Sequence, residues 1–414
     1  MHNSSFFSEF NQRNYYHQCT HFDELDNLMR MKKIRAYIGF DCTSPSLHVG
    51  SLLQIMCLRL LQKHGHQPIV LLGGGTTRIG DPSGKDETRK ILSENEIEKN
   101  IKNIKKILKI FLKNKDKNTK PIFVNNFDWL GKLNYINFLR DIGKHFTINK
   151  MLSFDSIKLR LDRDQSLSYM EFNYMILQAY DFLQLNKKKN CILQVGGSDQ
   201  WGNIVNGVDL IKRSLSKEVY GLTTPLITLA SGAKMGKTEK GAVWLDQKLL
   251  LPYDYWQFWR NVDDKDVIKF LKMFTDLELN RIENLQNKSS NINELKILLA
   301  NETTKMIHGE KASLQAEKTA KDTFYKKSIG KDLPKVELKK NKIKNGINIL
   351  DLVLLSNISN SKSEVRRFIK NKGIRINNEI VNDEKLNVNI EDFSDKNMLK
   401  LSHGKKMHVI VKIV

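Results

Sequence analysis

Hydrophobic and polar positions between residues 36 and 72 predict a strand, a helix and a second strand. β-Branched and aromatic residues dominate Ala36–Phe40, which is typical of a strand. Turn-forming residues follow, and from Val49 to Leu60 apolar residues then recur every three or four positions, as in a helix that ends at Gly65. Pro68–Leu72 is a second apolar strand. Such a unit indicates a parallel sheet, whose first strand-to-helix turn offers free N–H groups to a phosphate.

A polar stripe interrupts a later apolar segment, Leu167–Leu185, which we predict to be one helix. Tyr174, Gln178 and Asp181 are four and three residues apart and therefore share one face. A solvent-facing stripe is the alternative, but nearly every other position of the segment is apolar. Because buried polar groups need partners, we favour a bound ligand as the partner of this stripe.

Three glycine-containing loops extend the candidate site. They are residues 73–89 (GGGTTRIGDPSGKDETR), residues 196–203 (GGSDQWGN), which follow a predicted strand at Cys191–Val195, and residues 231–241 (SGAKMGKTEKG). Glycines and an acidic residue after a strand fit a ligand site at the carboxyl edge of an α/β sheet. Neither the first nor the third loop fits a P-loop. In the first loop, Gly80 and Gly84 are one residue closer together than the two glycines of a P-loop. In the third loop, Ser231 stands where the first glycine is needed before Gly236-Lys237-Thr238.

The order of elements predicts an α/β fold with a Rossmann-like parallel sheet, followed by helices and a small α+β domain. We assign residues 1–245 to the Rossmann-like domain, 246–328 to a helical domain, 329–346 to a polar linker and 347–414 to the C-terminal domain. Within the first domain, a connecting region at about 120–165 contains many aromatic residues, either as ordinary core or as a subunit interface with Trp129 as its anchor.

The C-terminal domain is predicted to carry a basic surface. Ser361 and Glu364 have the spacing of a capping box, and the helix that they begin ends at Gly373. Its basic residues, with one from the following strand, suit contacts with RNA phosphates: Arg366, Arg367, Lys370, Lys372 and Arg375.

Charge and composition restrict the class of protein. The 414 residues carry a formal net charge of +22, which suggests a nucleic-acid partner, although a general lysine bias would produce the same value. Four cysteines without metal-ligand spacing fit a reducing compartment, and no metal site is expected. Neither a targeting segment nor an apolar run of about 20 residues is recognisable, so we expect a cytoplasmic protein that does not enter membranes.

Taken together, the motifs resemble those of bacterial-type tyrosyl-tRNA synthetases, a family of class I aminoacyl-tRNA synthetases. His48-Val49-Gly50-Ser51 resembles the first class signature (HIGH), and residues 234–238 (KMGKT) resemble the second (KMSKS). Residues 37–41, 80–85 and 196–202 and the polar stripe resemble tyrosine-specific segments, and the C-terminal domain resembles the alpha-L type of RNA-binding domain. The resemblance covers nearly the whole chain.

The resemblance implies a two-step reaction, in which tyrosine and ATP form tyrosyl-adenylate and pyrophosphate before tyrosine passes to tRNA(Tyr). ATP with Mg²⁺ would be a substrate, with no tightly held cofactor, and the enzyme would be a homodimer. Tyrosine would be bound by Tyr37, Asp81, Tyr174, Gln178, Asp181 and Gln200. ATP would be bound by Gly39, Asp41, His48, Gly50, Ser51, Gly197, Asp199, Lys234 and Lys237. The transition state would be stabilised by Thr43, His48, Lys85, Arg89, Lys234, Lys237 and Thr238.

Three positions depart from the family pattern. Ser51 replaces the second signature histidine, Ile38 stands where many members carry cysteine, and Cys42 where many carry proline. These differences concern the ribose contacts. Two other classes stay open at this point: a non-catalytic RNA-binding protein with a synthetase fold, and a P-loop NTPase with an RNA-binding tail. Tyrosine-dependent exchange of pyrophosphate into ATP separates them from a synthetase.

Overall fold

The computed structural model describes most of the chain, in two compact units. The residues described are 4–82, 91–114, 116–230, 232, 235–238, 241–287, 291–325, 333–344, 346–394, 397–404 and 407–414. The first unit comprises Met1–Leu250 with Phe258–Ile307, and the second comprises Leu251–Gln257 with His308–Val414. Most of the predicted helical domain therefore packs within the first unit, and the boundaries of the compact units differ from the predicted domain boundaries.

A six-stranded sheet forms the centre of the first unit, with the order β1-β6-β5-β2-β3-β4. Its five main strands are parallel, and the short β1 pairs antiparallel with β6 at one edge. The strands are β1 (Gln18–Cys19), β2 (Arg35–Asp41), β3 (Gln67–Gly73), β4 (Ile122–Asn125), β5 (Leu193–Gly197) and β6 (Tyr220–Thr224). The strand order reverses between β2 and β5, which is where ligands bind in open α/β sheets. The Rossmann-like sheet is thus confirmed.

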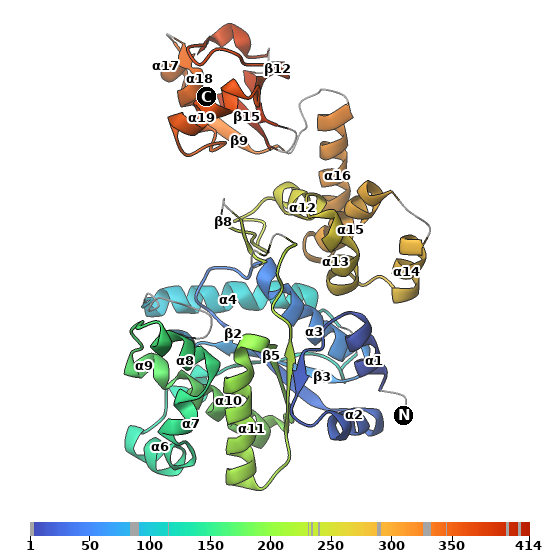
Figure 1. The fold of residues 1–414 in the computed structure, drawn as a ribbon, viewed down its shortest axis with the longest axis vertical. Coiled ribbons are helices and arrows are strands. Elements are labelled where there is room, and N and C mark those ends of the chain that lie inside the picture. The colour runs from blue at the N-terminus through green and yellow to red at the C-terminus, as the bar shows by residue number, and fades with distance from the viewer. Residues whose placement is uncertain are drawn as a thin grey trace. The chain divides into compact units, whose positions relative to one another are not determined.

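Long helices connect these strands and cover both faces of the sheet (Figure 1). They are α3 (Leu52–Lys63), α4 (Glu94–Phe111), α10 (Tyr174–Lys189) and α11 (Trp201–Leu215). A short 3₁₀ turn, Val49–Ser51, precedes α3. The single helix predicted at Leu167–Leu185 is wrong at its start, because Asn173 separates a short helix, α9 (Tyr169–Phe172), from α10. The capping box of Ser168 and Glu171 starts that separate turn.

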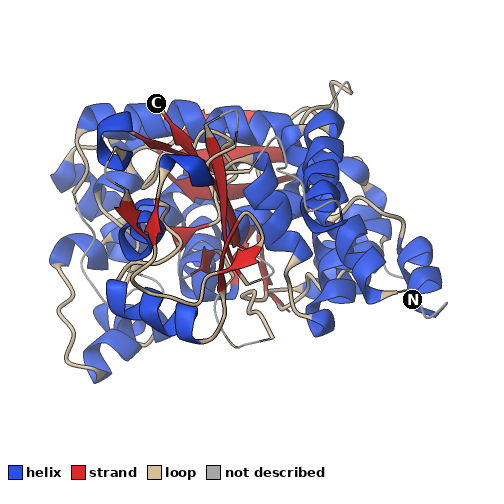
Figure 2. Ribbon diagram, turned by 90° about the horizontal axis from the view of Figure 1, so that it is seen from above, coloured by secondary structure: helices blue, strands red, loops and turns tan. Residues whose placement is uncertain are grey.

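The remaining elements of the first unit are mostly shorter, with α15 as the exception, and Figure 2 distinguishes helices from strands by colour. They are α1 (Ser5–Gln12), α2 (Phe22–Met31), α5 (Phe127–Leu130), α6 (Tyr135–Asp141), α7 (Ile148–Leu152), α8 (Asp155–Asp162), β7 (Lys237–Thr238), β8 (Gly241–Ala242), α13 (Val267–Phe274), α14 (Leu279–Asn287) and α15 (Ile292–His308). Helix α12 (Pro252–Arg260) crosses the boundary between the two units. No described helix is both long and apolar enough to cross a lipid bilayer.

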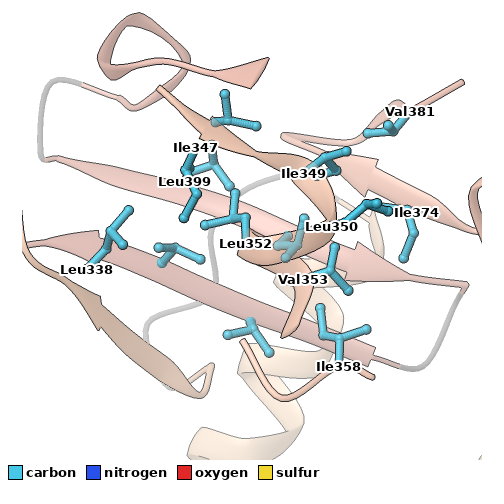
Figure 3. Close-up of a cluster of buried hydrophobic side chains, with 14 of the residues drawn as sticks. Leu338, Ile347, Ile349, Leu350, Leu352, Val353, Ile358, Ile374, Val381 and Leu399 are labelled. Carbon is cyan, nitrogen blue, oxygen red and sulfur yellow. The ribbon is translucent and has the colours of Figure 1, made fainter. Parts of the chain in front are cut away.

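The second unit contains a five-stranded sheet with the order β12-β11-β14-β15-β9 and a two-stranded sheet of β10 and β13. Its strands are β9 (Lys335–Leu338), β10 (Ile347–Asn348), β11 (Ile374–Ile376), β12 (Glu379–Ile380), β13 (Asn387–Val388), β14 (Met398–His403) and β15 (Met407–Ile413). Its helices are α16 (Glu310–Tyr325), α17 (Lys340–Ile343), α18 (Ile349–Leu355) and α19 (Lys362–Lys370). Ile349, Leu352, Val353 and Leu399 form the centre of its core (Figure 3).

The prediction of a polar linker at 329–346 is wrong for residues 335–343. β9 pairs parallel with β15, and α17 follows it directly. Leu338 and Ile343 are 2% and 1% exposed within the core of the second unit. The three apolar side chains of residues 335–343, Val336, Leu338 and Ile343, therefore all contact this core. The composition of the segment, which is rich in lysine, does not reveal this.

The start of α19 also differs in detail from the prediction. The Ser361 side chain accepts the N–H of Glu364, as expected for a cap. The Glu364 carboxylate, however, accepts hydrogen bonds from the Ser359 hydroxyl and the Asn360 N–H instead of from Ser361. Only half of the capping box forms, because the preceding turn brings Ser359 closer to the carboxylate.

Candidate active site

A cavity of about 370 Å³ lies at the carboxyl ends of β2 and β5, where the strand order reverses. The side chains predicted from the polar stripe and the glycine loops meet around it. The predicted residues that line it are Tyr37, Gly39, Asp41, Thr43, Gly50, Ser51, Asp81, Tyr174, Gln178, Asp181, Gly197, Asp199 and Gln200. The stripe thus faces a cavity and not the solvent, which places a ligand-sized space beside it.

The carboxylate of Asp181 sits at a buried polar position in the wall of this cavity. Its two oxygens accept hydrogen bonds from Trp129 Nε1 at 2.7 Å and from Asn126 Nδ2 at 2.9 Å. Burial raises the pKa of Asp181 to about 7, although these two donors favour the charged form. Two N–H donors aimed at one carboxyl group fix its orientation and leave its remaining lone pairs as acceptors.

Tyr37 lies near Asp181 and has a polar group without a partner. Its ring is 1% exposed and packs against Phe182, with ring centroids 5.3 Å apart. Its hydroxyl group is buried and has no hydrogen-bond partner among the described residues. Burial raises the pKa of Tyr37, with Asp181 as the next cause, so the hydroxyl keeps its proton and remains a donor. An unpaired buried hydroxyl costs about 1–3 kcal/mol, which a hydroxyl-bearing ligand would recover.

The interpretation of Trp129 as the anchor of a subunit interface is wrong. The side chain is 8% exposed, belongs to the core beside α10, and donates its indole N–H to Asp181. Trp129 therefore holds Asp181, which lines the cavity, and does not line the cavity itself. Its aromatic neighbours in sequence do not share this environment, since Phe127 and Tyr135 are exposed.

Asp41 connects the polar groups on the other side of the cavity. Its Oδ1 accepts from the Thr76 hydroxyl at 2.7 Å, and its Oδ2 accepts from the Tyr174 hydroxyl at 2.9 Å. Asn126 Nδ2 also lies 3.0 Å from Thr76 Oγ1, so hydrogen bonds run continuously from Asp181 through Asn126 to Asp41. Burial and the nearby Asp41 raise the pKa of Tyr174, which holds its proton on the hydroxyl. The network fixes both carboxylates relative to each other.

A second hydrogen-bonded group forms where α10 meets α11. Gln200 Nε2 donates to Asp81 Oδ2 at 2.8 Å. Asn203 Nδ2 lies 3.2 Å from Gln178 Oε1 and 3.1 Å from Gln200 Oε1. Asp81 is 8% exposed, so its carboxylate is an acceptor in a largely desolvated place. A cationic amino group is the ligand chemistry that suits such a position.

The two class signatures come together beside this cavity. His48 Nδ1 accepts the N–H of Gly50 at 3.0 Å, which leaves Nε2 as the protonated nitrogen. His48 forms an isolated bridge with Trp244, and Val49 N–H donates to the Val243 carbonyl. Gly236 has φ +118, and a Cβ atom there would lie 2.8 Å from His48 Nδ1. Glycine is thus required where the second signature passes the first.

The other predicted site residues divide into two groups. Lys85, Arg89 and Lys234 lie outside the described residues, and Lys237 and Thr238 are described only as the backbone of β7. The basic residues of the second unit are exposed on α19 and β11 and in the turn between them: Arg366, Arg367, Lys370, Lys372 and Arg375. The Nε atom of Arg366 also lies 3.7 Å from Oε1 of Glu384.

Sequence reasoning missed two residues that organise the cavity, Asn126 and Thr76. Asn126 is fully buried directly after β4, and its Oδ1 accepts the N–H of Gly75 at 2.7 Å. Thr76 stands three residues after β3. The rule that functional side chains follow the carboxyl ends of parallel strands could have selected both. What it could not indicate is their shared role in joining Asp41 to Asp181.

Comparison with known proteins identifies the fold and the site. Residues 29–325 match the family of class I tRNA synthetases described as "W and Y", and residues 325–411 match the SYY-like C-terminal domain of tyrosine--tRNA ligase. The chain therefore belongs to the class I aminoacyl-tRNA synthetases.

Its relatives narrow this class to one branch. The chain is 67% identical to the tyrosine--tRNA ligase of Pelagibacter ubique and 51% identical to that of Rickettsia felis, over 99% of this chain and 100% of each relative. A solved structure of a C-terminally truncated mitochondrial tyrosyl-tRNA synthetase from Aspergillus nidulans is 30% identical, with a TM-score of 0.70 over 77% of this chain and 94% of that one. The resemblance to tyrosyl-tRNA synthetases is thus confirmed, and the family is that of the tyrosine--tRNA ligases.

Proposed function

We propose that this chain is a tyrosine--tRNA ligase that forms tyrosyl-adenylate from tyrosine and ATP and then transfers tyrosine to the 3′-terminal adenosine of tRNA(Tyr). The observation that carries the proposal is the pair of groups in the cavity wall. The Tyr37 hydroxyl lacks a partner, and the Asp181 carboxylate is held by two N–H donors. A phenolic hydroxyl satisfies both at once, because it donates to Asp181 and accepts from Tyr37.

Tyrosine is oriented from both of its ends. Tyr37 and Asp181 hold the phenol, while Asp81, Tyr174 and Gln178 hold the amino group. Two observations support this assignment. Asp81 is a largely buried carboxylate, and the Tyr174 hydroxyl donates its hydrogen bond to Asp41, so that the Tyr174 oxygen can accept a hydrogen bond from the amino group. Gln200 and Asp41 lie beside the reacting carboxylate. Phenylalanine lacks the hydroxyl, so it leaves Tyr37 unpaired and binds less tightly.

ATP enters as its magnesium complex, a substrate. Gly39, Gly197 and Asp199 lie at the ends of β2 and β5 and hold adenosine and ribose together with Gly50 and Ser51. The magnesium ion is expected to be held mainly by the phosphates of ATP and by water.

No enzyme nucleophile is required for the first step, because the tyrosine carboxylate attacks the α-phosphate of ATP and pyrophosphate leaves. The protein supplies position and charge stabilisation. Thr43 and the Nε2–H of His48 donate to the leaving phosphates. The cationic side chains of the two loops stabilise the transition state, with Thr238 beside them: Lys85, Arg89, Lys234 and Lys237.

The second unit binds tRNA through the basic side chains of α19 and β11, which contact phosphates and leave the amino-acid site unchanged. This assignment is supported by their exposure and by the separate core of the unit. An enzyme that charges tRNA works where translation occurs, so we place it in the cytoplasm.

The catalytic unit forms a homodimer through an apolar surface on α6, α7 and α9. Tyr135, Ile136, Ile148 and Tyr169 are 57%, 68%, 60% and 66% exposed there. Large apolar side chains gathered on connecting helices are typical of a surface that a partner covers. The Tyr135 and Tyr169 hydroxyls lie 3.0 Å apart, which places α6 beside α9 in this surface.

The test of the activity is the exchange of labelled pyrophosphate into ATP, run with each of the 20 amino acids. Exchange with tyrosine alone is expected, followed by charging of tRNA(Tyr). A chain that binds tRNA but shows no exchange would be a non-catalytic RNA-binding protein, and hydrolysis of ATP without any amino acid would indicate an NTPase.

A further inference from the structure

Helix α13 lies outside the cavity, yet its carboxyl end is held by residues from the start of the chain. The guanidinium of Arg13, 3% exposed, donates to the carbonyl oxygens of Lys272, Thr275 and Leu277 at 2.7–3.0 Å. The Tyr15 hydroxyl donates to the Met273 carbonyl at 2.6 Å. A cation at a helix carboxyl end satisfies carbonyl groups that the helix leaves unpaired. α13 is therefore fixed firmly to the body of the first unit.

The amino-terminal end of α13 holds a different part of the chain. Asp266 is 5% exposed, and its Oδ2 accepts the backbone N–H of Ala230 at 2.8 Å. Lys269, one turn further, donates to the Thr228 carbonyl at 3.5 Å. Asp266 makes no capping hydrogen bond to its own helix, while Asp263 caps the preceding turn through the N–H of Lys265. The Asp266 carboxylate is thus directed at the backbone of residues 228–230.

Ala230 stands at the base of the second signature. The N–H of Met235 donates to the Ile227 carbonyl at 2.9 Å, so residues 227 and 235 are tied together on either side of it. Ile227 lines the cavity, and Gly236 passes directly beside His48. The position of the Ala230 backbone therefore affects where Met235 and Gly236 lie relative to His48 of the first signature.

We propose that Asp266 is a positioning residue for adenylate formation, which holds the backbone at Ala230 so that the second signature reaches the His48 side of the cavity. Asp266 lies in neither the tyrosine site nor the cavity lining. A fixed backbone N–H on a buried carboxylate defines one position, whereas its loss leaves the N–H unpaired and the segment free to shift. The inference rests on the proposed function, in which the second signature acts on the ATP phosphates.

The experiment compares four full-length chains: wild type, Asp266→Ala, Asp266→Asn and Asp264→Ala. Asp266→Asn keeps an oxygen that can accept from Ala230. Asp264→Ala is the matched control, because it removes an exposed carboxylate of the same turn, paired with Lys296 and not with the loop. Pyrophosphate exchange gives kcat and the KM for ATP, equilibrium binding gives the Kd for tyrosine, and thermal melting checks the fold.

Asp266→Ala is expected to lower kcat at least about tenfold with the tyrosine Kd changed less than about twofold, as for a contact that acts in the transition state. Asp266→Asn should recover most of the loss, and Asp264→Ala should equal wild type. Should Asp266→Ala fail to fold, Lys269→Met removes the weaker contact of the same helix end and is expected to lower kcat about threefold.

Three results would overturn the inference. The first is an unchanged kcat in Asp266→Ala, or in Lys269→Met where that variant is needed. The second is an increase of the tyrosine Kd as large as the decrease in kcat. The third is an Asp266→Asn variant whose kcat is as low as that of Asp266→Ala. Absence of exchange in the wild-type chain would overturn the proposed function together with the inference, whereas an active wild type beside an equally active Asp266→Ala rejects the inference alone.

Discussion

The buried carboxyl group of Asp181 makes the stability of this protein depend on pH in a measurable way. Its pKa is raised from 3.8 to about 7 in the folded chain, and burial is the cause. Below about pH 4 both the folded and the unfolded chain hold the proton, so the group contributes no pH dependence. Between about pH 4 and 7 only the folded chain holds it, so stability falls as pH rises. Above about pH 7 the loss is complete.

The size of this effect follows from the change in pKa. One pKa unit corresponds to about 1.4 kcal/mol, so ionising Asp181 in the folded protein costs about 4 kcal/mol in full. About 3 kcal/mol of this falls between about pH 4.5 and pH 8. A typical domain has a stability of about 5–15 kcal/mol, so the loss is large enough to see in an unfolding curve.

Asp181→Asn tests the reasoning, because its carboxamide does not ionise. Asn126 and Trp129 donate to different oxygens of the carboxylate, and the carboxamide replaces one of these oxygens with an NH2 group that cannot accept, which costs about 1–3 kcal/mol at every pH. Urea unfolding at about pH 4.5 and about pH 8 should show that the wild type loses about 3 kcal/mol more than the variant between the two. Asp128→Asn, at an exposed carboxylate, controls for the lost charge. Equal losses in wild type and Asp181→Asn would refute the buried-carboxyl account.

Three further predictions concern activity and assembly. Asp181→Ala and Tyr37→Phe should each lower the preference for tyrosine over phenylalanine at least about fivefold in kcat/KM of exchange, since the loss of one hydrogen-bond partner of the phenol costs about 1–3 kcal/mol, and an unchanged preference would reject the assignment. Lys237→Ala should lower the rate of adenylate formation while the tyrosine Kd stays nearly constant, and the reverse pattern would contradict a role in the transition state. Ile136→Asp should convert a dimer into monomers in sedimentation at micromolar concentration, with Leu314→Asp on α16 as the exposed control; a wild-type monomer would reject the interface.

Sequence patterns predicted the sheet and most of the cavity because both follow from local rules. The strand, turn and helix of residues 36–65 can be recognised from the local spacing of apolar residues, without knowledge of the rest of the fold. The polar stripe on α10 could be recognised because its neighbours in the helix are apolar, so partners were required. These residues line the cavity as expected.

The predictions that were wrong concern residues whose environment depends on contacts between distant segments of the chain. Trp129 has an ordinary aromatic context in sequence, and only the approach of α10 turns its indole N–H toward Asp181, 52 residues later. The parallel pairing of Lys335–Leu338 with β15 joins positions more than 70 residues apart, and no periodicity within four residues can reveal it. A segment rich in lysine can thus hold a core residue such as Leu338 while resembling a linker.

The corrected boundary changes how the two halves of the molecule should be separated. A chain cut near residue 341 would keep β9 but lose β15, its only partner strand in the described sheet, and would expose Leu338. A cut after Tyr325 removes the whole core shown in Figure 3 and none of the first unit. The truncated synthetase of Aspergillus nidulans, which covers 77% of this chain, is a precedent for such a fragment.

The fragment 1–325 should therefore form tyrosyl-adenylate at close to the full-length rate, because every residue assigned to that step precedes the cut. It should charge tRNA(Tyr) poorly, since it lacks the five basic side chains of α19, β11 and their connecting turn. If all five contact phosphates, the slope of log K against log salt should become shallower by about 4 in the fragment. The full-length variant Arg366→Gln with Arg367→Gln and Lys370→Gln should show the same change in part, with adenylate formation intact. A fragment that charges tRNA normally, or one that folds but makes no adenylate, would contradict this division of labour.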